Sequence, residues 1–309
     1  MIQGTCGENL TWIFDNSKLI ISGSGQMNDC QNFSEVTGES IKQLIAEEGA
    51  TSIGSFAFSF CADLKRVTLP ETLNKIGVGA FNFCENLSEI KIPANVTAIS
   101  KSAFCGCWSL TEIILPEKLS ELGDNVFSNC ASLQAIKIPA GVRELGIDIF
   151  KGCESLKSVT LPDGLNRIGA GAFEVCESLT EIKIPDSVTE IGENIFNGCT
   201  SLEKIYYRAD SGFEDKLQVG NTAQLIPIDA EKTISYCGKN VFWSLDNGTL
   251  LIKKNPAAPA DADFSTGYEA WNFVEENIKS IKIERGIIPD KSFFEWFYQQ
   301  SWCNQLIFF

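Results

Sequence analysis

A period of 23 residues runs through the middle of the chain and restricts it to a narrow class of folds. Within each period an aliphatic residue is followed by phenylalanine, cysteine and leucine at constant spacing. The four columns are Ile53, Ile76, Ile99, Leu122, Leu145, Ile168 and Ile191; Phe58, Phe81, Phe104, Phe127, Phe150, Phe173 and Phe196; Cys61, Cys84, Cys107, Cys130, Cys153, Cys176 and Cys199; and Leu64, Leu87, Leu110, Leu133, Leu156, Leu179 and Leu202. A fixed period of this length predicts a solenoid, in which each coil buries its apolar side only against its neighbours.

Each period also contains the pattern of a short strand. In one coil Leu179, Ile182 and Ile184 are separated by polar residues, and Pro185 follows at once. Such alternation indicates a half-buried strand, and proline ends it because proline has no backbone N–H to donate. We therefore predict seven coils over residues 53–207, each with one short strand, stacked in a parallel sheet with about 4.8 Å between strands.

The sequence of these coils resembles a known repeat. The string Ala172-Phe173-x-x-Cys176-x-Ser178-Leu179-Thr180-Glu181-Ile182-Lys183-Ile184-Pro185 is similar to the BspA-like leucine-rich repeat, also called the treponeme-type repeat. The resemblance implies a leucine-rich-repeat solenoid, an α/β horseshoe-like fold with short parallel strands, 23-residue coils and β-rich capping modules. It also implies a surface or secreted protein, because members of this family are typically found there and several are linked to adhesion.

The segments on either side of the array define the other expected domains. Residues 1–52 resemble the N-terminal cap of such arrays, and residues 208–233 resemble the C-terminal cap and a linker. Residues 234–309 repeat the start of the chain, since Cys237-Gly238-Lys239-Asn240-Val241 matches Cys6-Gly7-Glu8-Asn9-Leu10. We expect this last segment to be a second cap-like module followed by one degenerate repeat.

The degenerate repeat ends in an aromatic tail. Its expected column residues are Ile288, Phe293 and Trp296, and its expected strand residues are Cys303, Leu306 and Phe308. Residues 293–309 contain eight aromatic side chains, and an exposed patch of that kind invites association. Two outcomes are open: the tail packs onto residues 234–286, or it buries itself against a second copy of the chain and makes a dimer.

The charge and hydropathy of the chain limit its partners. The formal net charge is −15 and basic residues are not clustered, which argues against binding nucleic acid or an anionic membrane surface. No apolar run approaches the roughly 18 residues of a transmembrane helix, so no membrane insertion is expected. No apolar secretory segment precedes Cys6, which leaves both a trimmed mature form and a cytosolic protein open.

The twelve cysteines pose a choice between disulfides, a metal site and free thiols. Seven of them form the repeating column, where neighbouring thiols would be close enough to bridge. The column lies between phenylalanine and leucine columns, however, and free cysteine serves there as a small buried hydrophobe. A zinc site needs four converging ligands, whereas a stack supplies one thiol per coil. We predict buried free thiols and no metal.

The composition also argues against an enzyme. The chain has no histidine, which removes Ser-His-Asp and Cys-His catalysis and imidazole metal ligands. Glu89, Glu112 and Glu181 share a column beside lysines, and charge pairing on a solvated face explains them better than an acid–base pair does. We expect no catalytic residues and no cofactor.

A protein partner is expected on the solenoid surface. The outward residues of the strands are mixed in charge and poor in aromatics, and only Arg66, Ile114 and Tyr206 belong to types favoured in interface hot spots. Trp108 and Cys105 break their columns, which leaves two interpretations open: simple local packing of Trp108, which is favoured, or an exposed spot on the third coil. The alternative for the strand face is a merely solvated surface.

Two functions follow from these features. The first is a non-catalytic interaction protein, adhesin-like by family resemblance, which binds an unidentified protein through its solenoid. The second is a structural or scaffold repeat protein inside the cell, favoured by the missing secretory segment and the many thiols.

Overall fold

The computed structural model describes residues 1–29, 32–38, 40–209, 211–217, 223–228, 235–238, 241–246, 249–254, 280–283 and 306–308. The chain forms two compact units. The first comprises Met1–Tyr207 with Ser211–Ile226, and the second comprises Arg208–Asp210 with Pro227–Phe309. No helix in the described ranges is long and apolar enough to cross a membrane.

The first unit begins with an antiparallel meander that changes into a parallel stack. Strands β1 (Ile2–Thr5), β2 (Asn9–Asp15) and β3 (Lys18–Ser24) are antiparallel, and β3 then pairs in parallel with β4 (Gln43–Ala46). Between β3 and β4 lies the short helix α1 (Phe33–Thr37), which Asn32 caps by accepting from the backbone N–H of Ser34. The meander thus offers the edge of β3 as the template for the first parallel strand.

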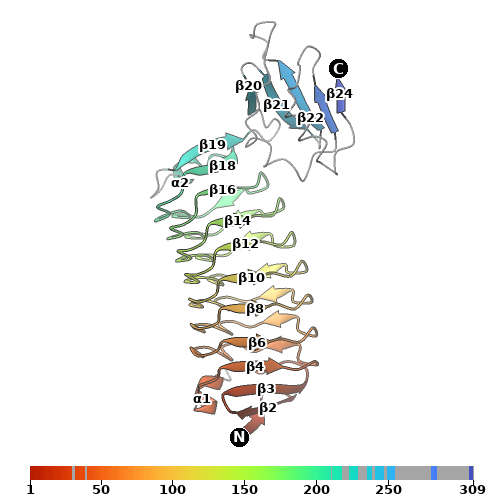
Figure 1. Ribbon diagram of the computed structural model, residues 1–309, viewed down its shortest axis with the longest axis vertical. Coiled ribbons are helices and arrows are strands. Elements are labelled where there is room, and N and C mark those ends of the chain that lie inside the picture. Colours follow the sequence, from red (N-terminus) through yellow and green to blue (C-terminus); the bar gives the residue numbers. More distant parts are fainter. Residues whose placement is uncertain are drawn as a thin grey trace. The chain divides into compact units, whose positions relative to one another are not determined.

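The coils follow as a column of short parallel strands (Figure 1). After β4 this strand series consists of β6 (Arg66–Thr68), β8 (Glu89–Lys91), β10 (Glu112–Ile114), β12 (Ala135–Lys137), β14 (Ser158–Thr160), β16 (Glu181–Lys183) and β18 (Lys204–Arg208). Strands β8 and β10 pair in parallel with Ile90 opposite Ile113, one period apart, as predicted. The series is divided among four hydrogen-bonded sheets: β1–β2–β3–β4–β6, β8–β10, β12–β14 and β16–β18–β19.

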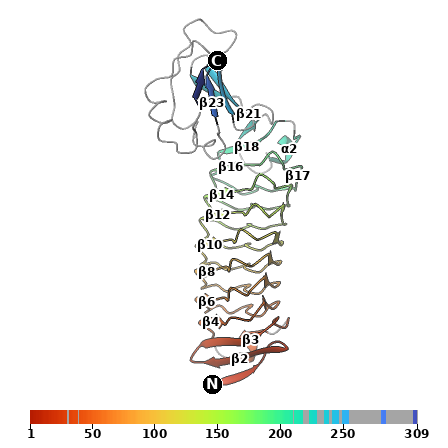
Figure 2. The same ribbon diagram turned by 90° about the vertical axis from the view of Figure 1, so that its right-hand side faces the viewer.

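The prediction of one strand per coil was wrong, because each coil contains a second, two-residue strand. These strands are β5 (Ser52–Ile53), β7 (Lys75–Ile76), β9 (Ala98–Ile99), β11 (Glu121–Leu122), β13 (Glu144–Leu145), β15 (Arg167–Ile168) and β17 (Glu190–Ile191). They carry the aliphatic column and form two parallel sheets on another side of the coils, as β16 and β17 illustrate in Figure 2. Two residues are too short for the alternation that identifies a strand in a sequence.

The phenylalanine column is the centre of the core. Its seven rings are at most 1% exposed, and successive rings stack with centroids 5.4–6.0 Å apart. Phe33 of α1 extends the stack at 5.3 Å from Phe58, and Trp12 meets Phe33 edge-on at 5.7 Å. Phe58 N–H donates to Ala80 O of the next coil at 2.8 Å, and the same bond recurs along the column.

The cysteine column is buried and unbridged, as predicted. Cys84, Cys107, Cys130, Cys153 and Cys176 are all 0% exposed free thiols. From Cys84 onward each Sγ donates to the phenylalanine carbonyl of the preceding coil at 3.0–3.3 Å. The thiol therefore donates a hydrogen bond to a turn carbonyl inside the core. A purely apolar side chain at this position could not donate that bond.

After the last coil the first unit continues into a helix and a strand. Helix α2 (Glu214–Leu217) buries Leu217 and most of the neighbouring Phe213 in the core, and β19 (Gln224–Ile228) pairs with β18. Lys216 Nζ donates to Ile191 O at 3.0 Å and so ties α2 to β17.

The second unit repeats the topology at the start of the first. Strands β20 (Ser235–Gly238), β21 (Val241–Asp246) and β22 (Thr249–Lys254) are antiparallel, and β23 (Ser280–Ile283) and β24 (Leu306–Phe308) continue in parallel. This order is the same as the order β1–β2–β3–β4–β6 at the start of the first unit. Leu306 and Phe308 lie in the expected strand. The residues Ile288, Phe293, Trp296 and Cys303, and the packing of the aromatic tail, lie outside the described residues.

Candidate interaction surfaces

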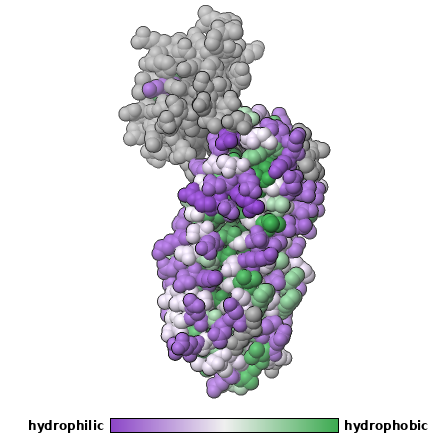
Figure 3. All heavy atoms as spheres, turned by 180° about the vertical axis from the view of Figure 1, so that it is seen from behind, coloured by the Kyte–Doolittle hydropathy of each residue, from purple (hydrophilic) through white to green (hydrophobic). Residues whose placement is uncertain are grey.

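Apolar side chains reach the surface of the coils at several places. Seen from behind, hydrophobic residues form a discontinuous column between hydrophilic ones along the first unit (Figure 3). Among the most exposed large apolar side chains of the coils are Phe60, Trp108 and Ile114, at 62%, 47% and 72%. They belong to two surfaces, one on the strand series and one on the turns that carry the phenylalanine column.

The strand surface contains a shallow hollow of about 470 Å³. Ile114 on β10 borders it together with Glu112 and Lys137. The space exists because Ala135 and Ser158 are small, where other coils place arginine, glutamate or lysine. The hollow has a mixed apolar and charged rim and exposes one large apolar side chain.

The structure does not bring the predicted partner-binding residues together. Arg66 on β6 is exposed, and Tyr206 on β18 is half-buried, but β6 and β18 lie two and four coils from Ile114. Only Ile114 of these three borders the hollow. Trp108 lies in a turn and is exposed, whereas its neighbour Cys105 is half-buried.

Trp108 belongs to a larger cluster that the sequence analysis did not identify, here named the aromatic strip: Phe56, Phe60, Phe83 and Trp108. Phe60 and Phe83 stack with centroids 5.3 Å apart and planes 4° apart. Phe83 meets Trp108 edge-on at 6.4 Å and 89°. Phe56 is 41% exposed, and its ring lies so close to Gly79 that a Cβ there would come within 2.6 Å of it. The strip thus extends over the first three coils.

Three of the four strip residues have a left-handed backbone. Phe56, Phe60 and Phe83 have φ of 58°, 62° and 55°. This conformation is unfavourable by about 1–2 kcal/mol for a side chain with a Cβ, and it is rare for bulky residues. Other coils place residues suited to it at the same two columns. These are Gly79, Ser102, Asn125, Asp148, Gly171 and Asn194 in the Phe56 column, and Gly106, Asn129, Gly152 and Gly198 in the Phe60 column.

The strip phenylalanines, together with Val175 in the Phe60 column at φ 59°, therefore depart from the pattern of the array. Backbone strain that core packing does not offset is concentrated at functional sites in folded proteins. The signal was present in the sequence as phenylalanine where the period calls for glycine or asparagine. The sequence prediction missed it because the period was defined by the four buried columns, and the strip residues stand in other columns.

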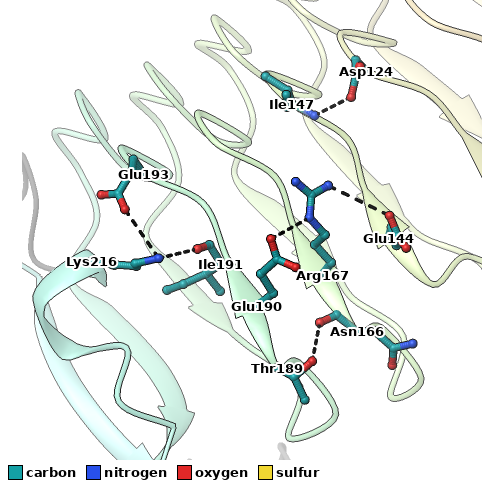
Figure 4. A network of polar contacts seen from close by, with 10 residues as sticks. All are labelled: Asp124, Glu144, Ile147, Asn166, Arg167, Thr189, Glu190, Ile191, Glu193 and Lys216. Atoms are coloured by element: carbon teal, nitrogen blue, oxygen red, sulfur yellow. Dashed lines mark hydrogen bonds and ion pairs between the residues drawn. The ribbon is translucent and has the colours of Figure 1, made fainter.

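The exposed polar groups link coils rather than converge on a site. Arg167 lies between Glu190, at 3.1 Å, and Glu144, at 4.0 Å, on neighbouring strands (Figure 4). Lys216 Nζ likewise lies 3.5 Å from Glu193. Each of these contacts joins one coil or terminal segment to the next, as charge pairing on a solvated face does. No group of acidic residues and cysteines with metal-ligand geometry occurs in the described part of the chain.

The thiols are not activated as nucleophiles. Burial raises the pKa of Cys61 and Cys153 to about 12, and desolvation also raises the pKa of the half-buried Cys105. A reactive cysteine needs a lowered pKa, because the thiolate is the attacking species. The described cysteines therefore suit a structural role.

The profile of the BspA type leucine rich repeat region matches residues 30–153 and 121–249 in six copies. The chain belongs to the BspA-type leucine-rich repeat family. Members of this family are leucine-rich repeat proteins that generally act in protein interaction or at surfaces, and generally without catalysis. No curated protein sequence matches the chain significantly.

Solved structures include several similar leucine-rich repeat proteins. A leucine-rich repeat protein from Bacteroides ovatus is 21% identical with a TM-score of 0.50, over 98% of this chain and 76% of its own. A leucine rich cell surface protein from Faecalibacterium prausnitzii is 22% identical with a TM-score of 0.44, over 94% and 72%. A T. pallidum leucine rich repeat protein is 26% identical with a TM-score of 0.49, over 71% and 97%. The likeness to the Bacteroides ovatus protein supports the fold of this chain but not a particular function.

Proposed function

We propose that this BspA-type solenoid is a non-catalytic adhesion protein of the cell surface that binds another protein through its coils. The observation that carries the proposal is the aromatic strip. Phe56, Phe60 and Trp108 are exposed, and the half-buried Phe83 contacts both Phe60 and Trp108. Three of the four residues have a strained backbone conformation. Exposed apolar clusters of this kind mark interaction sites more often than isolated apolar residues do.

The physical properties of the strip suit a binding surface. Aromatic side chains bury a large area for few rotatable bonds, so little side-chain entropy is lost on binding. The rings are fixed to successive coils that the buried phenylalanine stack holds in register. A pre-organised surface of this sort avoids much of the ordering cost that weakens flexible interfaces.

The strand surface remains a second place for contact in this proposal. Ile114 would provide an apolar anchor beside the hollow, and Arg66 and Tyr206 would contact only a partner that spans several coils. The many thiols do not favour the scaffold role inside the cell over a surface role, because buried, hydrogen-bonded thiols persist in oxidising and reducing surroundings alike.

Capture experiments with paired variants test the proposal. The immobilised chain would be exposed to extracellular-matrix and cell-surface proteins, and captured proteins would be quantified. The variant Phe83→Gly with Trp108→Ser removes half of the strip, and Arg66→Ser with Ile114→Ser serves as the matched strand-surface control. We expect the first pair of changes to abolish capture and the second to retain most of it. Equal capture by wild type and the strip variant, at unchanged thermal stability, would overturn the proposal.

A further inference from the structure

A hollow of about 550 Å³ lies at the Phe60 end of the aromatic strip. Its walls are α1 and the segment after it on one side and the turn of the next coil on the other. Its lining includes Ser34, Glu35, Ser40, Phe60 and Asp63. The hollow is thus a place where an aromatic ring and two carboxylates face the same space.

Phe60 is 62% exposed and lines this hollow. One face of its ring stacks on Phe83 of the following coil, at 5.3 Å and nearly parallel. The hollow is lined from the preceding segment, so it borders the opposite face of the ring. The face of an aromatic ring carries negative electrostatic potential and attracts a cation within about 6 Å of its centroid.

The two carboxylates have unused acceptor capacity. Glu35 Oε1 accepts from the Asn32 amide at 3.2 Å, and Asp63 Oδ2 accepts from the Ser40 hydroxyl at 2.6 Å. A carboxylate offers about four acceptor positions. Among the described residues neither carboxylate forms an ion pair, and the hollow has no lysine or arginine in its described lining.

We propose that this hollow binds an arginine side chain of a basic segment in the partner protein, an inference that rests on the proposed function. The guanidinium group is planar, so it stacks on the Phe60 ring and donates from its edge to Glu35 and Asp63. The net charge of −15 attracts a basic partner during the encounter. The remaining strip, from Phe83 to Trp108, contacts apolar residues beside the arginine.

The chain offers matched controls for each part of the hollow. Phe60→Asn removes the ring without changing charge, and asparagine already occupies the same column at Asn129. Val175→Asn is the same kind of change in that column at a distant coil. Glu35→Gln and Asp63→Asn remove one charge each, and Glu154→Gln removes one exposed charge elsewhere.

The test measures binding of a fluorescently labelled peptide of alternating arginine and glycine to the full chain by anisotropy. We expect Phe60→Asn to weaken binding roughly two- to thirtyfold, the range of a single cation–π contact, and Val175→Asn to leave it unchanged. Glu35→Gln and Asp63→Asn should each weaken it more than Glu154→Gln does. Equal effects of the paired changes would mean unspecific attraction to an acidic chain and would overturn the inference, as would absence of binding.

A further variant separates folding from binding. Phe60→Leu keeps an apolar side chain without a ring face, and it is expected to lose affinity as Phe60→Asn does. Retained affinity in Phe60→Leu would overturn the arginine site even if Phe60→Asn proved unstable. If strip variants abolish protein capture but the peptide binds all variants equally, the arginine inference fails while the proposed function stands.

Discussion

At the scale of single residues, the backbone conformation and burial of each position in the coil determine which side chain suits it. The cysteine column shows this most directly, because a buried position beside a turn carbonyl requires a small side chain with a weak donor. The left-handed backbone of the turn positions likewise favours glycine, asparagine or aspartate, and most coils have one of these residues there. Phe60, Phe83 and Val175 depart from that preference, and their departures are open to measurement.

Replacing Val175 with asparagine should stabilise the protein. Val175 has φ of 59°, a conformation that β-branched residues avoid, and Asn129 occupies the same column two coils earlier. Relief of this strain should raise the free energy of unfolding by about 1 kcal/mol, measured by chemical denaturation. The reverse change, Asn129→Val, should lower it by a similar amount. If both variants match the wild type, the left-handed turns are not strained.

The thiol column should make stability depend on alkaline pH. Burial raises the pKa of Cys61 and Cys153 to about 12 and that of Cys199 to about 11, from an ordinary 9.0. The folded state therefore holds protons that the unfolded state releases, so stability is complete below about pH 9 and falls between pH 9 and 12. Denaturation curves at increasing pH test this expectation. Cys153→Ala should make the decline less steep, and stability that stays constant to pH 11 would contradict the prediction.

At the scale of elements, the period determined what could be predicted. The strands from β6 to β18 and the buried columns followed from alternation and spacing, since both extend over several residues. The two-residue strands β5, β7, β9, β11, β13, β15 and β17 did not, because two residues are too few to show the alternation that identifies a strand. Helix α1 was not predicted either. Its Phe33 continues the phenylalanine stack, but Phe33 lies 25 residues before Phe58 rather than 23 and so falls outside the period.

Truncation of one stacked ring should destabilise several coils at once. Phe173 is fully buried between Phe150 and Phe196, with centroids at 5.5 and 5.6 Å. Phe173→Ala should lower the free energy of unfolding by about 3–5 kcal/mol, because it removes a large core side chain. Hydrogen exchange should accelerate in the coils on both sides, since solenoid stability is coupled between neighbours. Ile147→Ala, at an exposed position, is the control, and a loss below about 1 kcal/mol for Phe173→Ala would show that the stack is not core.

At the scale of the whole chain, the duplication and the solenoid could be predicted but the candidate site could not. The repeated cysteine–glycine segment predicted a cap-like module there, and β20 to β24 follow the same strand order as β1, β2, β3, β4 and β6. The phenylalanines of the aromatic strip are visible in the sequence as departures from their columns, but the contact of Phe83 with Trp108, which belongs to another column, depends on the fold. Arg66, Ile114 and Tyr206 were chosen for residue type, and the structure spreads them over seven strands of one series.

Photo-crosslinking tests the central claim, that partners bind at the aromatic strip. Benzoyl-phenylalanine would replace Trp108 in one variant and Ile114 in another, since both side chains are exposed and they lie on different surfaces. After irradiation with matrix and cell-surface proteins, we predict covalent adducts from position 108 at several times the yield from position 114. Adducts from position 114 alone, or equal yields from both, would contradict the account.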